Sequence, residues 1–155
     1  MKIKALCLIL GAIFLVGCTA EKQASAPALQ ETSEQLFQKA MTFLAQNKIP
    51  EAVQSLEQAA EVSPEEINSY FALAQLYMRL KSYDNAIIIC QKILQRDQKN
   101  PHVYLLMAGC YDLKGEPEKA SELVKISMAL FQEQNNMEGF KNAVEILKKL
   151  TPEEK

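Results

Sequence analysis

The sequence lacks several residue types on which common functions depend. It has no tryptophan and only one histidine, His102, among its 155 residues. A histidine-rich metal site is therefore excluded, and a Ser–His–Asp relay would have to use that single imidazole. Glycine and proline are too few, at five and six, for a collagen-like or low-complexity chain. These absences favour a binding module over an enzyme.

The chain also lacks an excess of positive charge. Lysine and arginine number 17 against 19 aspartates and glutamates, which gives a formal net charge of −2. Proteins that bind nucleic acid usually carry a basic stripe, so no nucleic-acid partner is expected. Apolar residues make up 48% of the chain, the usual share for a globular protein and too many for a disordered one.

Residues 1–17 differ from the rest of the chain. Lys2 and Lys4 precede an apolar run from Ala5 to Val16 that only Gly11 interrupts. A basic start followed by a short apolar segment is typical of a secretory signal peptide. A helix that spans a bilayer needs roughly 17–25 apolar residues, so this run is too short for a comfortable permanent span.

The apolar run ends with Leu15-Val16-Gly17-Cys18, which resembles the lipobox of bacterial lipoproteins. The resemblance implies that residues 1–17 are removed and that Cys18 carries covalent lipid, with no other cofactor. Two or more acyl chains anchor a protein stably. Because Thr19 replaces the aspartate that retains such proteins in the inner membrane, the family rule implies the periplasmic face of the outer membrane. The alternatives are a soluble secreted protein or a short uncleaved anchor.

Residues 18–32 comprise this cysteine and a segment of small and polar residues with one proline, which we expect to be a flexible tether.

From residue 33 onward the sequence repeats with a period of 34. The aligned positions are Leu36, Tyr70 and Tyr104; Ala40, Ala74 and Ala108; Phe43, Tyr77 and Tyr111; Ala52, Ala86 and Ala120; and Leu56, Cys90 and Val124. This pattern resembles the tetratricopeptide repeat, although only the first copy has the closing proline, Pro64.

The resemblance implies an all-α fold, an α-solenoid of three helix-turn-helix repeats at 33–66, 67–100 and 101–134 with a capping helix and tail at 135–155. Apolar spacing predicts helices near 33–46, 50–62, 66–80, 84–96, 101–114 and 118–132. A seventh helix should follow Asn136, with Phe140, Val144, Leu147 and Leu150 on its buried face. Its other face is charged and suits a cap; a partner-binding helix is the alternative.

In tetratricopeptide proteins the first helix of each repeat lines a concave groove. Carried onto this chain, the predicted peptide-binding residues are Phe37, Met41, Leu44, Phe71, Gln75, Met78, Leu105 and Asp112. An apolar trough of this kind suits an amphipathic helix or an extended apolar segment of a partner. Only Asn68 and Arg79 match the version of the family that clamps a carboxylate, so a chaperone-tail carboxylate is not the expected ligand. The tether or the seventh helix could instead cover the trough.

No catalytic or metal-binding constellation stands out. His102 has no nearby cysteine or acidic cluster in the sequence, and we expect it to be a solvated surface residue. Cys90 and Cys110 fall on helices that should be neighbours, so a disulfide is conceivable, but buried free thiols fit their core positions better.

The sequence therefore predicts a non-enzymatic adaptor that holds another envelope protein, reaches the membrane through its lipid and has no small-molecule substrate. Small lipoproteins of similar design serve as pilotins, as parts of outer-membrane assembly or as scaffolds for cell-wall enzymes. An enzyme on a helical scaffold is the remote alternative.

Overall fold

The computed structural model describes residues 31–151. The predicted signal peptide, Cys18 and nearly all of the predicted tether lie outside the described residues. Within the described range, no helix is both long enough and apolar enough to cross a membrane.

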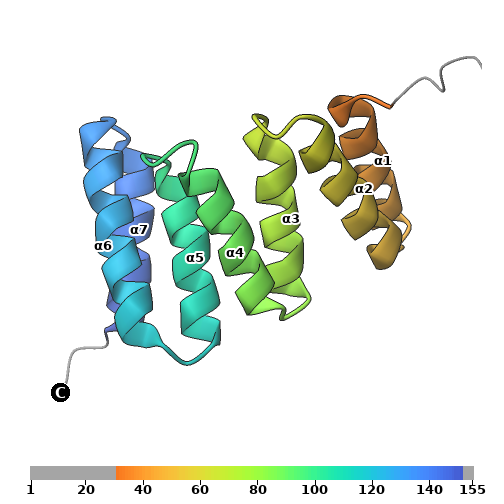
Figure 1. Cartoon of the computed structure of the whole chain (residues 1–155). Helices are drawn as coiled ribbons and strands as arrows, with labels where there is room; N and C mark the ends of the chain where they lie inside the picture. Colours follow the sequence, from red (N-terminus) through yellow and green to blue (C-terminus); the bar gives the residue numbers. More distant parts are fainter. Residues whose placement is uncertain (1–30, 152–155) are drawn as a thin grey trace, which may run out of the picture. The chain divides into compact units, whose positions relative to one another are not determined.

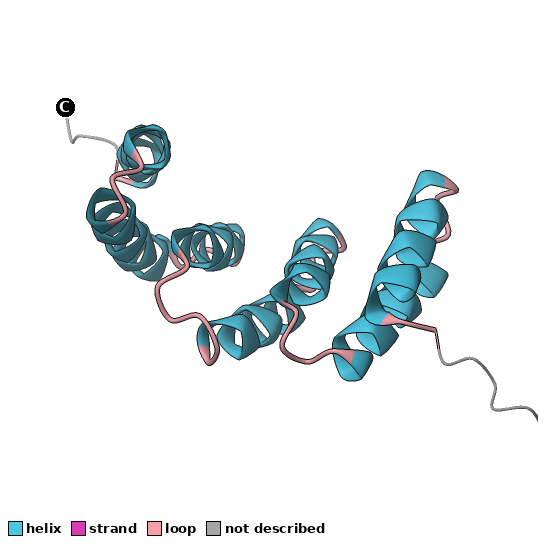
Figure 2. Cartoon of the chain, turned by 90° about the horizontal axis from the view of Figure 1, so that it is seen from above, coloured by secondary structure: helices cyan, strands magenta, loops and turns pink. Residues whose placement is uncertain are grey.

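The described chain folds into seven α-helices without a strand (Figure 1). They are α1 (Ser33–Ala45), α2 (Ile49–Val62), α3 (Ile67–Arg79), α4 (Tyr83–Leu94), α5 (Pro101–Leu113), α6 (Pro117–Glu133) and α7 (Met137–Leu150). Each helix packs against the next along the chain, and α3 also packs against α5. Seen from above, the helices follow one another in a row of pairs (Figure 2). This arrangement confirms the predicted all-α solenoid, and the six helices given bounds from the sequence agree within two residues at each end.

One turn geometry closes four of the helix pairs. The second residue after the helix has a positive φ of 55–80°, at Asn47, Lys81, Gly115 and Asn135. The next N–H then donates to the carbonyl five residues earlier, at 2.9 Å from Lys48 to Phe43 and at 2.8 Å from Asn136 to Phe131. This left-handed cap satisfies carbonyls that the helix end leaves open. Because the α6–α7 connection uses it too, α7 joins α6 as a tight hairpin.

The positions that repeat every 34 residues form much of the buried core. All three alanines at the 40-74-108 position and all three at the 52-86-120 position are at most 1% exposed. The position held by Leu56, Cys90 and Val124 is fully buried in every repeat. Alanine has no side chain beyond Cβ, so the two helices of each repeat approach closely at these points.

Cys90 and Cys110 are both buried, and both are free thiols. Burial raises the pKa of the Cys90 thiol to about 12, and the nearby Cys110 adds to the rise. Burial also raises the pKa of the Cys110 thiol. Both side chains belong to the apolar cluster that runs from α1 to α5, so they act as small apolar core residues.

The last helix packs through a slightly different set of residues than its sequence spacing predicts. Ala143 is fully buried, and Phe140, Ile146, Leu147 and Leu150 pack around it. Val144, which we expected on this face, is only partly buried and is not part of that cluster. The helix packs on α6 at the opposite end of the row from α1 (Figure 1).

Candidate binding groove

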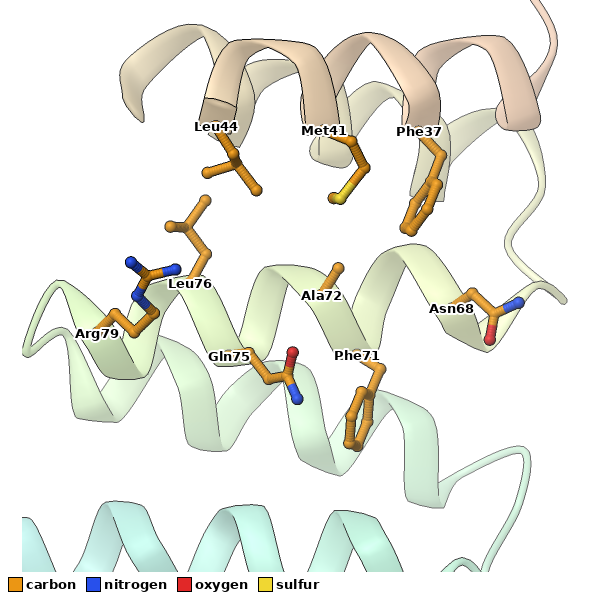
Figure 3. Close-up of a pocket in the computed structure, with 9 residues that line it drawn as sticks. All are labelled: Phe37, Met41, Leu44, Asn68, Phe71, Ala72, Gln75, Leu76 and Arg79. Atoms are coloured by element: carbon orange, nitrogen blue, oxygen red, sulfur yellow. The ribbon is translucent and has the colours of Figure 1, made fainter. Parts of the chain in front are cut away.

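A hollow of about 380 Å³ lies between α1 and α3 (Figure 3). Six of its nine lining residues are apolar, and the other three are two amides and one arginine. The lining consists of Phe37, Met41, Leu44, Asn68, Phe71, Ala72, Gln75, Leu76 and Arg79. Five of the eight residues predicted to bind a peptide therefore lie together around one space.

The two walls of the hollow have the same helical spacing. On α1, Phe37, Met41 and Leu44 follow at steps of four and three, which places them on one face. On α3, Ala72 and Leu76 point toward α1, whereas Phe71 and Gln75 point away from it (Figure 3). All three α1 residues and Phe71 are partly buried, so the hollow has an apolar wall that still meets solvent.

The three remaining predicted residues lie elsewhere. The sulfur of Met78 lies 3.6 Å from the point that a Cβ on Gly109 would occupy, so this side chain fills the space between α3 and α5. Leu105 packs against the core of α5, α6 and α7, and Asp112 is exposed. The hollow is thus confined to the first two repeats and does not run along all three.

Ala72 and Leu76 also line the hollow, although neither was among the residues predicted to bind a peptide. Leu76 is only 3% exposed, and it belongs to the face of α3 that meets the preceding repeat. The sequence does indicate this second face, because Ala72, Leu76 and Arg79 follow one another at the same steps of four and three as Phe37, Met41 and Leu44. The polar rim of the hollow comes from α3 alone, through Asn68, Gln75 and Arg79.

Other polar clusters of the described chain have structural roles. Lys114 pairs with Asp84 and joins α4 to the turn after α5. That hydrogen bond raises the pKa of Lys114, and the hydrogen bond from Lys119 lowers the pKa of the Glu116 carboxyl. The ammonium groups of Lys114 and Lys119 lie 5.9 Å and 5.3 Å from the centre of the Tyr111 ring. The Lys114–Asp84 pair ties the second repeat to the third, and the other contacts hold the turn between α5 and α6.

The single histidine lies on the surface, as expected. His102 is exposed in the first turn of α5, and its ring packs edge-on against Phe131 with the ring centres 5.0 Å apart. Among residues 31–151, no three side chains of the types that bind metals gather at one point. The arrangement around the hollow is suited to holding an apolar chain, with Asn68, Gln75 and Arg79 offering hydrogen bonds at one rim.

Solved structures with the same fold include proteins that hold peptides. The TPR2B domain of yeast Sti1, in complex with pHsp70, is 20% identical with a TM-score of 0.69, over 76% of this chain and 94% of that one. The Yersinia enterocolitica type III secretion translocator chaperone SycD is 19% identical with a TM-score of 0.69, over 76% and 88%. PcrH in complex with the chaperone binding region of PopD is 17% identical with a TM-score of 0.67, over 76% and 89%. At these identities the likeness is one of fold.

Comparison of the sequence with known protein families shows which family the repeats belong to. A search of the curated proteins found no match. The tetratricopeptide repeat family model matches residues 43–108 and again residues 80–142, which together span more than half of the chain. The second match extends into α7, which forms a hairpin with α6. The chain therefore belongs to the tetratricopeptide repeat family.

Proposed function

We propose that this protein is a lipid-anchored adaptor of the bacterial envelope that holds a segment of another envelope protein between α1 and α3. It acts by binding and carries out no reaction. The observation that supports this most directly is the hollow of about 380 Å³ with its apolar lining. An apolar cavity of about 150 Å³ can accept a benzene molecule, so this space can take about two apolar side chains of a partner.

The energetics suit a reversible contact. Full burial of one large apolar side chain is worth about 1.5–3 kcal/mol, and two such anchors would contribute about twice that. Ordering the bound segment cancels part of this gain. The resulting affinity is moderate, which fits a partner that is already concentrated at the same membrane.

The membrane anchor of this proposal is the lipid on Cys18. Its support is the sequence Leu15-Val16-Gly17-Cys18 at the end of an apolar run, and more than one acyl chain gives stable anchoring. Thr19 in place of aspartate favours the periplasmic face of the outer membrane. Within that compartment the adaptor would serve as a pilotin-like protein, a part of outer-membrane assembly or a scaffold for a cell-wall enzyme.

Proteins with this fold and bound peptides support the mode of action. SycD has been solved with a peptide of the translocator YopD, at 20% identity and a TM-score of 0.64. The first repeat domain of RPAP3 has been solved with an HSP90 peptide, at 21% identity and a TM-score of 0.64. By analogy, the first helices of the repeats are the surface on which this chain would hold its partner.

Two variants test the two halves of the proposal. Cys18→Ser should abolish incorporation of labelled palmitate and release the protein from the membrane fraction. A wild-type chain that takes up no label and fractionates as soluble would instead favour a secreted repeat protein.

For the groove, Met41→Glu should eliminate crosslinking to envelope proteins while far-ultraviolet circular dichroism stays helical. The matched control is Gln54→Glu, which adds the same charge at an exposed position of α2. If Met41→Glu retains every crosslinked partner that the control retains, the hollow is not the binding site.

A further inference from the structure

The two ends of the hollow carry opposite charges. Glu34 lies in the first turn of α1, and Glu65 and Glu66 come directly before α3. Arg79 is the last residue of α3, and Lys81 follows it in the turn. All five side chains are exposed.

These residues gather at two ends because α1 and α3 run in the same direction. Phe37 on α1 lies toward the Asn68 end of α3, and Leu44 lies toward the Leu76 and Arg79 end (Figure 3). The starts of the two helices, with their glutamates, therefore flank one end of the hollow. The ends of the two helices flank the other, where Lys48 adds a third cation in the turn after α1.

These charges are not neutralised by one another. The ion pairs of the described residues join other groups, such as Lys39 with Glu31 and Lys99 with Glu133. Glutamates at helix starts and an arginine at a helix end also suit the helix dipoles. That preference accounts for their positions and leaves their charges available to a third molecule, since a groove with apolar walls concentrates the field along its length.

We propose that the groove selects a segment whose charge is also divided, with basic residues at one end, two bulky apolar residues in the middle and acidic residues at the other end. The basic end would lie near Glu34, Glu65 and Glu66, and the acidic end near Arg79 and Lys81. This inference rests on the proposed function, because it specifies the partner of the same groove.

The segment is extended. Asn68 and Gln75 lie on the α3 rim only, and neither side chain takes part in a hydrogen bond with another described residue. Their amides can pair with the free N–H and C=O groups of an extended backbone, whereas a helix satisfies those groups internally. From Asn68 to Arg79 the helix rises about 16 Å at 1.5 Å per residue, which is about five residues of extended chain.

The test compares two synthetic peptides of identical composition. The first has two lysines at one end, a leucine and a phenylalanine separated by alanine in the middle, and two glutamates at the other end. The second has one lysine and one glutamate at each end around the same middle. Their binding to the full-length protein is measured by fluorescence anisotropy at low and at high salt.

We expect the divided peptide to bind about threefold to tenfold more tightly at low salt, since several exposed ion pairs act together. High salt should close most of this gap by screening. The double variant with Arg79→Glu and Lys81→Glu should remove the preference, whereas Lys92→Glu with Lys125→Glu, the same charge change on exposed positions of α4 and α6, should keep it.

The failures are distinguishable. Equal binding of the two peptides, lost in Met41→Glu, would overturn the charge inference and leave the groove as the binding site. Equal binding that Met41→Glu does not affect would overturn both. If neither peptide binds, the charge inference is overturned, and the crosslinking comparison of Met41→Glu with Gln54→Glu decides the proposed function separately.

Discussion

The substitution Gly139→Ala tests how α7 is attached to the solenoid. Gly139 lies in the first turn of α7, where its N–H donates to the side-chain oxygen of Asn136 at 2.8 Å. A Cβ at this position would lie 2.4 Å, 2.5 Å and 2.8 Å from three carbons of the Phe131 ring. Phe131 is fully buried, and the His102 ring packs against it, so the ring has little room to withdraw.

The magnitude follows from two opposing effects. Overpacking a filled core costs typically about 1–3 kcal/mol, and replacing glycine by alanine inside a helix returns up to about 1 kcal/mol. Because Gly139 is in the first turn, the returned part is small. We therefore expect Gly139→Ala to lower the free energy of unfolding by about 1–2 kcal/mol in urea titrations followed by circular dichroism.

The chain provides its own control. Gly109, in the middle of α5, has only the sulfur of Met78 within 4 Å of the point that a Cβ would occupy, at an ordinary contact distance of 3.6 Å. Gly109→Ala should therefore leave stability unchanged or raise it by up to about 1 kcal/mol. Adding Phe131→Leu to Gly139→Ala should cost less than the sum of the two single changes, because the smaller side chain makes room. If Gly139→Ala is as stable as Gly109→Ala, α7 does not dock through this contact.

Three further predictions concern single residues. Gly115→Ala should destabilise the protein by about 1 kcal/mol in the same titrations, because its φ of 80° strains any L-residue while no neighbour blocks a Cβ; an unchanged stability would contradict the left-handed turn. Cys90, with its pKa of about 12, should resist thiol reagents in the native protein and react in denaturant; rapid native labelling would show that the thiol is accessible. Burial and the 2.8 Å hydrogen bond to Glu57 raise the pKa of Tyr77 to about 12 from 10.0. The neutral phenol is thus favoured by folding, and its stabilisation is present below pH 10 and lost as the pH rises through 12. Ultraviolet titration of Tyr77→Phe against the wild type would refute this if the lost phenol titrates near 10.

The internal repeat predicted much of the fold because its regular spacing of small residues indicates where two helices pack closely against each other. Where two helices cross closely, only a small residue fits, so Ala40, Ala74 and Ala108 appear at a constant interval and all are buried. The connections repeat for a similar reason, since Asn47, Lys81 and Gly115 occupy the same left-handed position. The last helix follows no such interval. It packs through a cluster around Ala143 and a close approach of Gly139 to Phe131, and spacing alone selected Val144 where the structure packs Ala143 and Ile146.

The extent of the groove depends on side-chain sizes across two interfaces, and a repeat motif does not specify them. Between α3 and α5, Met78 extends into the space that the missing side chain of Gly109 leaves. Three residues predicted to bind a ligand therefore lie outside the hollow: Met78 fills this interface, Leu105 packs in the core of the third repeat, and Asp112 is exposed. Between α1 and α3, small Ala72 points toward α1 opposite Met41, and a hollow remains (Figure 3). The large side chain of Met78 opposite Gly109 fills the interface between α3 and α5, whereas the small side chain of Ala72 leaves a hollow between α1 and α3. A search for binding sites in short solenoids of this family should therefore compare the residues that face each other across successive first helices, in addition to the positions that the motif assigns to the concave side.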